Sequence, residues 1–224
     1  MELPVTDPSQ PPAGKIYPAW KRLACLPWDT LQLRLARRKT GEEFLRYFID
    51  LGGLRRDSVV LDVGCGRGRM AVPLTRHLSP RARYEGFDTL PASIAWCKRH
   101  IQRRYPQFRF TRADVFNAEY NPAGKTRPAE YVFPYGDETF DFVFLASVFT
   151  HLLPDDLEHY LAEIARVTRK DGTCLATFFL LNAESLRLVD VGRSSQDFRH
   201  EIGAQRTTNP ARPEAASPSS SARP

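Results

Sequence analysis

The sequence predicts an α/β fold in which a doubly wound, mostly parallel sheet is covered by helices on both faces. Three features point to it: continuous apolar segments of strand length, helical segments of about 10–15 residues that alternate with them, and a glycine-rich turn after the first strand. Apolar strands of this kind are typical of sheets buried on both faces, and the helices supply the crossovers that parallel strands need. A chain of 224 residues is long enough for one well-cored domain.

Each element is expected from its own pattern. The five predicted strands, in chain order, are residues 58–63, 83–88, 107–115, 140–148 and 173–181. Apolar residues at helical spacing predict helices at 28–39, 40–54, 68–78, 92–104, 155–167 and 182–191. Thr40 and Glu43 have the spacing of a capping box, and Gly52 with Gly53 should end the second helix.

The composition divides the chain into three parts. Residues 1–19 hold five of the 18 prolines and are expected to form a flexible arm. Residues 20–182 should form the α/β domain with an N-terminal helical cap. Residues 183–224 are expected to be a helix fragment followed by a disordered tail, because the chain beyond Gly203 has no aromatic residue and too little apolar surface to offset ordering.

Charge and cysteine content argue against several classes of protein. The net charge is +6, but the basic residues are scattered, so we expect a solvated surface and no nucleic-acid partner. No apolar run has the length of a membrane helix, and the first 15 residues have no apolar core, so we expect a cytoplasmic protein. The four cysteines have no metal-ligand spacing, which predicts reduced, mostly buried thiols and no metal.

The glycine-rich turn in "VVLDVGCGRGRM" is the first candidate binding feature. Gly64, Gly66 and Gly68 follow a strand end, where ligands bind in open parallel sheets. A dinucleotide fingerprint would need its third glycine at Arg69, and a phosphate-binding loop would need a Lys followed by Ser or Thr. The tight spacing therefore favours a small zwitterionic group over a pyrophosphate.

Acidic residues follow the next two predicted strands. Asp88 ends "YEGFD" and could accept hydrogen bonds from both hydroxyls of a ribose. Asp114 in "RADVFN" could accept the exocyclic amine of adenine. Either residue alone is explained equally well as a turn residue. Three consecutive strand ends with suitable groups favour an adenosine-type ligand.

These segments resemble a known family. "VLDVGCGRGR", "YEGFD", "ADVFN" and "FPYGDETFDFVFLASVFTHL" are similar to motifs I to IV of class I S-adenosylmethionine-dependent methyltransferases, and the resemblance covers about residues 44–181. It implies a Rossmann-like fold of the class I methyltransferase type, S-adenosyl-L-methionine as cofactor, and methyl transfer to an acceptor, which we expect to be a small molecule.

The resemblance also implies roles for residues of the first two motifs. Gly64, Gly66 and Gly68 would line the methionine and ribose portions of the cofactor. Asp62 would orient the loop and reach the amino group, directly or through water. Asp88 would hold the ribose hydroxyls.

The later motifs would complete the cofactor site. By resemblance, Asp114 and the backbone of Val115 would border the adenine. Ala146 and Ser147, at the end of the fourth strand, would lie under the methionine moiety.

His151 in "SVFTHL" is the best-placed candidate for a general base, which an oxygen or carbon nucleophile would need. The alternative is that His151 caps or packs in the turn before Pro154. Tyr135 and Asp137 are weaker candidates, because nothing in the sequence distinguishes them from turn residues. A methyl transfer itself requires mainly alignment of the two reactants.

One departure from the family pattern keeps other functions open. We expect no antiparallel hairpin after Asn182, which would leave the strand at 173–181 at an exposed edge. Either a partner chain covers that edge, or the chain is a shortened, noncatalytic cofactor-binding or interaction protein. A nucleic-acid or protein methyltransferase is a further alternative, although no Asn-Pro-Pro-aromatic motif stands near the fourth strand. A nicotinamide dehydrogenase is disfavoured by Arg69.

Overall fold

The computed structural model describes residues 31–118, 120–179 and 181–194, together with Phe198, 200–202 and 205–207. The chain divides into two compact units, and the larger one, Trp28–Phe178, contains the predicted sheet. The predicted arm at residues 1–19 and the last part of the predicted tail lie outside the described residues.

The sheet has five parallel strands, as predicted. They are β1 (Val59–Val63), β2 (Arg83–Asp88), β3 (Phe108–Arg112), β4 (Phe140–Leu145) and β5 (Thr168–Ala176). Their order is β3-β2-β1-β4-β5, so the direction of winding reverses between β1 and β4. This reversal places the carboxyl end of β1 at the switch point, where open α/β sheets bind ligands.

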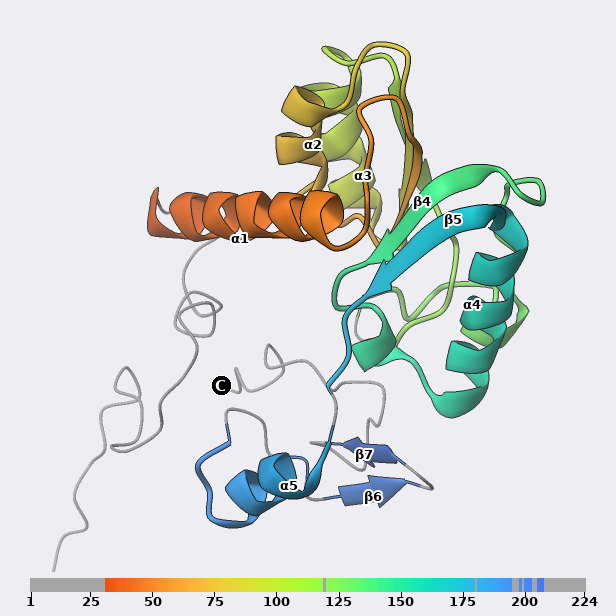
Figure 1. Ribbon diagram of the computed structural model, residues 1–224. Helices are drawn as coiled ribbons and strands as arrows, with labels where there is room; N and C mark the ends of the chain where they lie inside the picture. The colour runs from red at the N-terminus through yellow and green to blue at the C-terminus, as the bar shows by residue number, and fades with distance from the viewer. Residues whose placement is uncertain are drawn as a thin grey trace, which may run out of the picture. The chain divides into compact units, whose positions relative to one another are not determined.

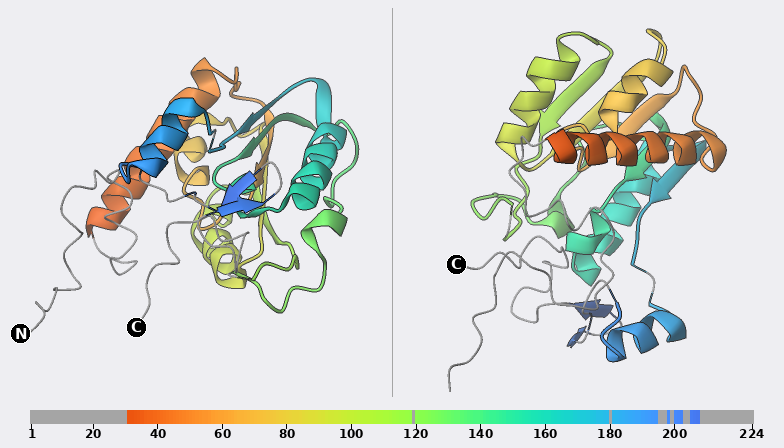
Figure 2. Two further views of the ribbon diagram at one scale, coloured as in Figure 1. Left: turned by 90° about the horizontal axis from the view of Figure 1, so that it is seen from below. Right: turned by 90° about the vertical axis from the view of Figure 1, so that its left-hand side faces the viewer.

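Helices cover both faces of the sheet (Figures 1 and 2). The α-helices in the described residues are α1 (Leu31–Asp50), α2 (Ala71–His77), α3 (Pro91–Cys97), α4 (Pro154–Val167) and α5 (Ala183–Asp190). Side chains of α1, α2 and α3 join one hydrophobic cluster on the sheet, and those of α4 join a second cluster on the opposite face. In the described part of the chain, none of these helices is both long and apolar enough to cross a membrane.

The two helices predicted before the first strand are one continuous helix, α1. The capping box at Thr40 and Glu43 is therefore wrong, because Thr40 lies inside the helix. Gly41 lies inside it as well, at a point of close packing: a Cβ there would stand 2.5 Å from the carbonyl oxygen of Arg69. This contact explains a residue that otherwise costs about 1 kcal/mol in a helix interior.

The last strand of the sheet differs from the prediction at both ends. β5 begins at Thr168, directly after α4, and contains a bulge: Phe140 and Phe142 of β4 lie opposite Thr168 and Thr173. It ends at Ala176 rather than at residue 181. Its neighbour β4 stops at Leu145, so the later residues have no ladder to join.

The smaller unit corrects a second expectation. β6 (His200–Ile202) and β7 (Gln205–Thr207) form a two-stranded antiparallel sheet of their own. This hairpin does not join the five-stranded sheet, which in the described part of the chain lacks a C-terminal antiparallel hairpin, as predicted. The prediction of disorder beyond Gly203 is wrong for Gln205–Thr207, which form β7. The predicted helix of this region is confirmed as α5, whose N-cap Asn182 accepts a hydrogen bond from the Ser185 amide.

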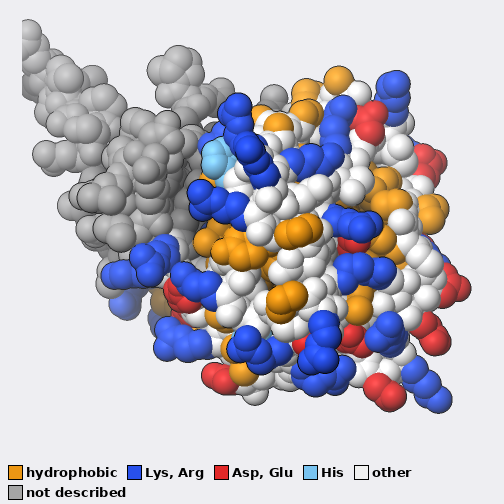
Figure 3. Space-filling view, turned by 90° about the horizontal axis from the view of Figure 1, so that it is seen from above, with side chains coloured by type: hydrophobic (Ala, Val, Ile, Leu, Met, Phe, Trp, Pro, Cys, Tyr) orange, Lys and Arg blue, Asp and Glu red, His pale blue; other side chains and the backbone are white. Residues whose placement is uncertain are grey.

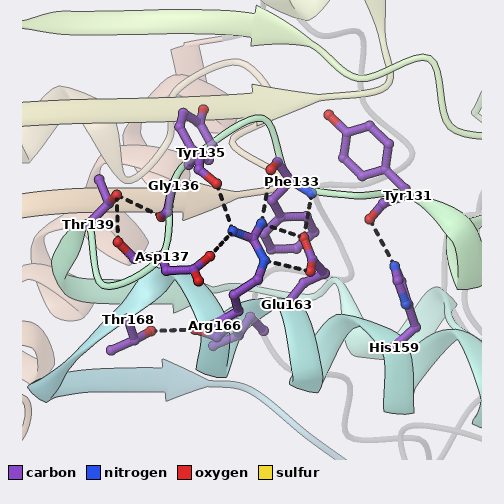
Figure 4. Close-up of polar contacts among 11 residues, drawn as sticks. Tyr131, Phe133, Tyr135, Gly136, Asp137, Thr139, His159, Glu163, Arg166 and Thr168 are labelled. Carbon is purple, nitrogen blue, oxygen red and sulfur yellow. Dashed lines mark hydrogen bonds and ion pairs between the residues drawn. The ribbon is translucent and has the colours of Figure 1, made fainter.

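An arginine on α4 fixes the irregular segment that precedes β4 (Figure 4). The Arg166 guanidinium pairs with Glu163 at 2.8 Å and with Asp137 at 2.8 Å, and it donates to the carbonyls of Phe133 and Tyr135. Glu163 in turn accepts the amide of Phe133 at 2.6 Å. Two carbonyls of this irregular segment thus find their hydrogen-bond donor in the Arg166 side chain, in place of the backbone amides of regular secondary structure.

Replacing Arg166 by Met should lower the free energy of unfolding by about 2–4 kcal/mol at pH 7, measured by urea denaturation, because it leaves the Glu163 carboxylate, only 10% exposed, without its cation. The hydrogen bond from Arg166 lowers the pKa of Glu163 below 4.5. The difference in unfolding free energy between the wild type and Arg166→Met should therefore be fully present above pH 4.5. It should shrink as the pH falls through the lowered pKa of Glu163.

Arg187→Met is the matched control, because its pair with Glu184 is solvent-exposed at both ends. That variant should change stability by less than about 0.5 kcal/mol. Equal effects of the two substitutions would contradict the role assigned to Arg166.

Candidate functional site

The glycine loop lies at the carboxyl end of β1. Gly64, Gly66 and Gly68 have φ angles of 77°, 50° and 70°, all in the left-handed region that glycine adopts without strain. The loop is tied to the neighbouring strand, because the amides of Gly64 and Cys65 both donate to the carbonyl of Phe87 at 2.9 and 3.0 Å.

The space beside each of the three glycines, where a side chain would otherwise stand, is used differently. A Cβ at Gly64 would stand 2.4 Å from a methyl group of Val148, and one at Gly68 would stand 2.6 Å from Ile101. A Cβ at Gly66 would meet nothing within 4 Å. The outer two glycines therefore accommodate the protein's own side chains, and Gly66 is the glycine of this loop that faces open space.

Asp88, at the end of β2, organises this loop. Its Oδ2 accepts the amide of Gly66 at 2.8 Å, and its Oδ1 accepts the amide of Leu90 at 2.9 Å. Burial raises the pKa of Asp88, and these backbone hydrogen bonds act in the opposite direction. Each carboxylate oxygen still has a lone pair for a further donor, so the residue can bind hydroxyl groups without releasing the loop.

Asp62, near the end of β1, is almost completely buried, at 2% exposed. Its Oδ2 accepts the hydroxyl of Tyr84, a partner on β2 that the sequence did not indicate. Desolvation raises the pKa of Asp62 to about 7; the Tyr84 hydrogen bond opposes this shift, and the charge of Asp88 adds to it. The two predicted carboxylates are therefore close enough to interact electrically.

Asp114 and Val115 continue the same edge of the sheet after β3. The amide of Ala113 donates to the carbonyl of Asp88 at 3.0 Å, which brings the end of β3 next to the glycine loop. Asp114 is half-buried and pairs with Arg112 at 3.0 Å. The Val115 carbonyl accepts from the buried side chain of Asn121 at 2.8 Å, so the chain turns back and closes over this position.

The end of β4 is held in an unusual conformation. Ser147 has a φ of 66°, which is uncommon for a residue with a side chain. Its amide donates to the Thr177 hydroxyl at 2.8 Å, so the residue after β5 stabilises the turn. Ala146 is half-buried, and Val148 packs against Gly64. The predicted residues Ala146 and Ser147 thus adjoin the glycine loop.

His151 lies in a 3-10 turn, Phe149–His151, that follows this segment. Its amide donates to the Val148 carbonyl at 2.9 Å, and its half-buried ring packs edge-on against Tyr120 at a centroid distance of 5.3 Å. The structure therefore brings His151 to the same end of the sheet as the glycine loop. It does not bring Asp137 there, because Asp137 pairs with Arg166 at the amino end of β4.

A cavity of about 480 Å³ lies at the opposite, amino end of the sheet, bounded by residues before β1 and β4 and by the bulge of β5. Arg169 and Asp141 in its wall bind each other at 2.6 Å, and Asp141 also accepts the amide of Val59. Two of the charged side chains in its lining are thus paired with each other. The cavity is separate from the predicted residues at the carboxyl ends.

On the face drawn in Figure 3, charged side chains do not gather into one patch. Figure 3 shows Lys and Arg side chains dispersed over the face in view, with acidic and apolar side chains among them. Within the described residues, no group of three or more His, Cys, Asp or Glu side chains is arranged to hold a metal ion.

The raised pKa of Asp62 predicts a pH effect on stability. A carboxyl group that binds its proton more tightly in the folded chain stabilises the fold at low pH, and this contribution is lost as the pH rises from 3.8 to about 7. Compared with Asp62→Asn, the wild type should lose more than about 1 kcal/mol of unfolding free energy across this range, measured by urea denaturation. Asp155→Asn, at an exposed position, should retain the wild-type profile. Parallel profiles for wild type and Asp62→Asn would contradict the assignment.

The fold of this chain is similar to that of a solved structure. The solved structure of the PH0226 protein from Pyrococcus horikoshii superposes with a TM-score of 0.50 at 20% identity, covering 74% of this chain and 67% of that one. This likeness supports the fold alone.

Sequence comparison identifies closer relatives. Phthiotriol/phenolphthiotriol dimycocerosates methyltransferase of Mycobacterium tuberculosis is 36% identical over 124 residues, which are 55% of this chain and 37% of the relative. A Mycobacterium ulcerans protein with the same designation, numbered 1, is 35% identical over 129 residues, or 58% of this chain and 39% of the relative. This chain thus spans well under half the length of the curated relatives it matches.

The family described as methyltransferase domain matches residues 60–172, just over half of the chain. This range runs from β1 into the bulge of β5 and includes the glycine loop, Asp88 and His151. Together with the five-stranded sheet, it shows that the chain belongs to the class I S-adenosylmethionine-dependent methyltransferase family.

Proposed function

We propose that this chain binds S-adenosyl-L-methionine at the carboxyl ends of β1, β2, β3 and β4 and directs its methyl group to a hydroxyl-bearing small molecule. The observation that carries the proposal is the open face of Gly66, whose amide Asp88 holds in place. A ligand can approach the backbone there while the other two glycines are occupied by Val148 and Ile101.

The residues around this face suit the parts of the cofactor. Asp88 has free lone pairs for the ribose hydroxyls, and Asp114 with the Val115 backbone would border the adenine. The carboxyl of Asp62, beside the loop, would attract the amino group of the methionine portion, with Ala146 and Ser147 beneath it. When bound, the cofactor supplies a methyl group already activated by a sulfonium, so the chain has mainly to align the reactants and exclude water.

The class of acceptor is inferred from the relatives. Their names specify phthiotriol and phenolphthiotriol dimycocerosates, and a triol carries hydroxyl groups. A hydroxyl oxygen is a poor nucleophile until its proton is removed, so this acceptor needs a base. We assign that role to His151, which lies just after β4 at the same end of the sheet as the glycine loop and carries an imidazole, the commonest general base.

A noncatalytic cofactor-binding or interaction protein is the second candidate. A nucleic-acid acceptor has less support, because the basic side chains in view are dispersed (Figure 3). A partner chain along β5 and a cytoplasmic location stay predictions. A turnover assay separates an enzyme from a protein that only binds the cofactor.

Cofactor binding is tested with two glycine variants. Gly66 and Gly53 both have positive φ angles, 50° and 67°, and a Cβ at either would meet no atom within 4 Å. Ala at either position should cost about 1–2 kcal/mol of stability, from backbone strain alone. Calorimetric titration with S-adenosylhomocysteine should show at least a tenfold loss of affinity for Gly66→Ala and none for Gly53→Ala, because only Gly66 adjoins the site. Equal affinities would reject this site, and a wild type that binds neither S-adenosylhomocysteine nor S-adenosylmethionine would reject the proposed cofactor.

The base is tested by His151→Gln. We expect kcat for a phthiotriol dimycocerosate acceptor to fall by about 10²–10⁴, because proton removal is lost, while the affinity for S-adenosylhomocysteine stays within about twofold. His159→Gln is the matched control. His159 lies on α4, where its ring contacts the Tyr131 carbonyl at 3.0 Å, outside the proposed site. An unchanged kcat in His151→Gln would remove His151 from the mechanism.

A further inference from the structure

Two thiols converge on the carbonyl oxygen of Gly66. The Sγ of Cys97, the last residue of α3, lies 3.4 Å from this oxygen, and the Sγ of Cys65, inside the loop, lies 3.8 Å from it. Cys97 is completely buried and Cys65 is 5% exposed. They differ from Cys174, which is exposed on β5; two of the three cysteines in the described residues are therefore buried, in line with the expectation of mostly buried thiols.

The surroundings of Cys65 favour its thiol form. The hydrogen bond between Cys65 and Cys97, followed by burial and nearby carboxylates, raises the pKa of Cys65 well above 9.0. Cys65 therefore keeps its proton at neutral pH. A protonated thiol is a weak hydrogen-bond donor, and the Gly66 carbonyl is the acceptor within its reach.

The two peptide groups that flank Gly66 are thus held from opposite directions. Asp88 accepts the Gly66 amide at 2.8 Å, and Cys97 approaches the Gly66 carbonyl from α3. Gly68 makes this approach possible, since a Cβ there would stand 3.3 Å from the Cys97 sulfur. Glycine alone would leave the peptide after it free to rotate and to turn its carbonyl toward the open face.

We propose that Cys97 is a positioning residue for the cofactor: its thiol holds the Gly66 carbonyl toward α3, so that this oxygen does not enter the space the ligand needs. The inference rests on the proposed function, because the open face of Gly66 is the proposed cofactor surface. It assigns a binding role to a buried side chain that does not itself touch the ligand.

The experiment compares three variants of α3 by calorimetric titration with S-adenosylhomocysteine and by thermal unfolding. Cys97→Ala removes the donor and should weaken binding about three- to tenfold. Cys97→Ser keeps a donor of similar size and should bind within about twofold of wild type. Ile94→Val is the matched control: Ile94 is buried on the same helix, and the variant should lower the melting temperature without changing affinity.

The outcomes separate the two proposals. If Cys97→Ala lowers the melting temperature but binds as tightly as wild type, Cys97 is only a packing residue and the inference is overturned. Equal losses in the Ala and Ser variants would also overturn it, because they would show that the donor is not what matters. If the wild type does not bind S-adenosylhomocysteine, the proposed function fails, and the role of Cys97 fails with it. Weaker binding in Cys97→Ala with recovery in Cys97→Ser supports the inference.

Discussion

The hydrogen bond between the Gly66 amide and the Asp88 carboxylate is the interaction on which the site depends. It joins the turn after β1 to the end of β2, two elements 22 residues apart in sequence. Because it fixes the turn, the outer glycines can be packed by Val148 from the segment after β4 and Ile101 from the segment after α3. Its cost is the desolvation of the Asp88 carboxylate, which the backbone donors reduce but do not cancel, so the pKa of Asp88 stays raised.

The remaining parts of the site are attached to this bond through backbone hydrogen bonds and side-chain packing. The end of β3 reaches it through the Asp88 carbonyl, and the segment after β4 reaches it by packing on Gly64. Thr177 holds the strained turn at Ser147 from the other side. Four strand ends thus meet through contacts that do not require a ligand, so the site is largely preorganised, which reduces the ordering that binding must oppose.

The sequence predicted where the five strands lie along the chain and that they are parallel, because most of them are short apolar runs bounded by turn residues. β2 agrees with its prediction at both ends. The sequence could not show that α1 passes unbroken through Thr40. The packing of Gly41 on the Arg69 carbonyl joins positions 28 residues apart, and local pattern does not reveal such a contact.

The candidate site shows the same division. Asp88 and Asp114 were predicted from their positions at strand ends, and Asp62 from the resemblance to the family. Sequence reasoning missed Tyr84, Asn121 and Thr177, which bind Asp62, the Val115 carbonyl and the Ser147 amide, because each is recognisable only after the fold has brought it near. Asp137 was misjudged for the matching reason: its role is set by Arg166, 29 residues later.

The bulge in β5 has a consequence for how this chain tolerates changes of length. Thr168 and Thr173 are five residues apart, yet they face Phe140 and Phe142, which are two apart. β5 thus has three more residues than β4 between these pairs. Because three is odd, the side chains before and after the bulge alternate out of phase, and the two halves of β5 pair with β4 in separate registers. Insertions or deletions within residues 169–172 would therefore be absorbed at the amino end of the sheet. Leu175 and Thr177 would keep their places beside β4. The candidate site at the carboxyl end of the sheet would therefore not be shifted by such changes of length.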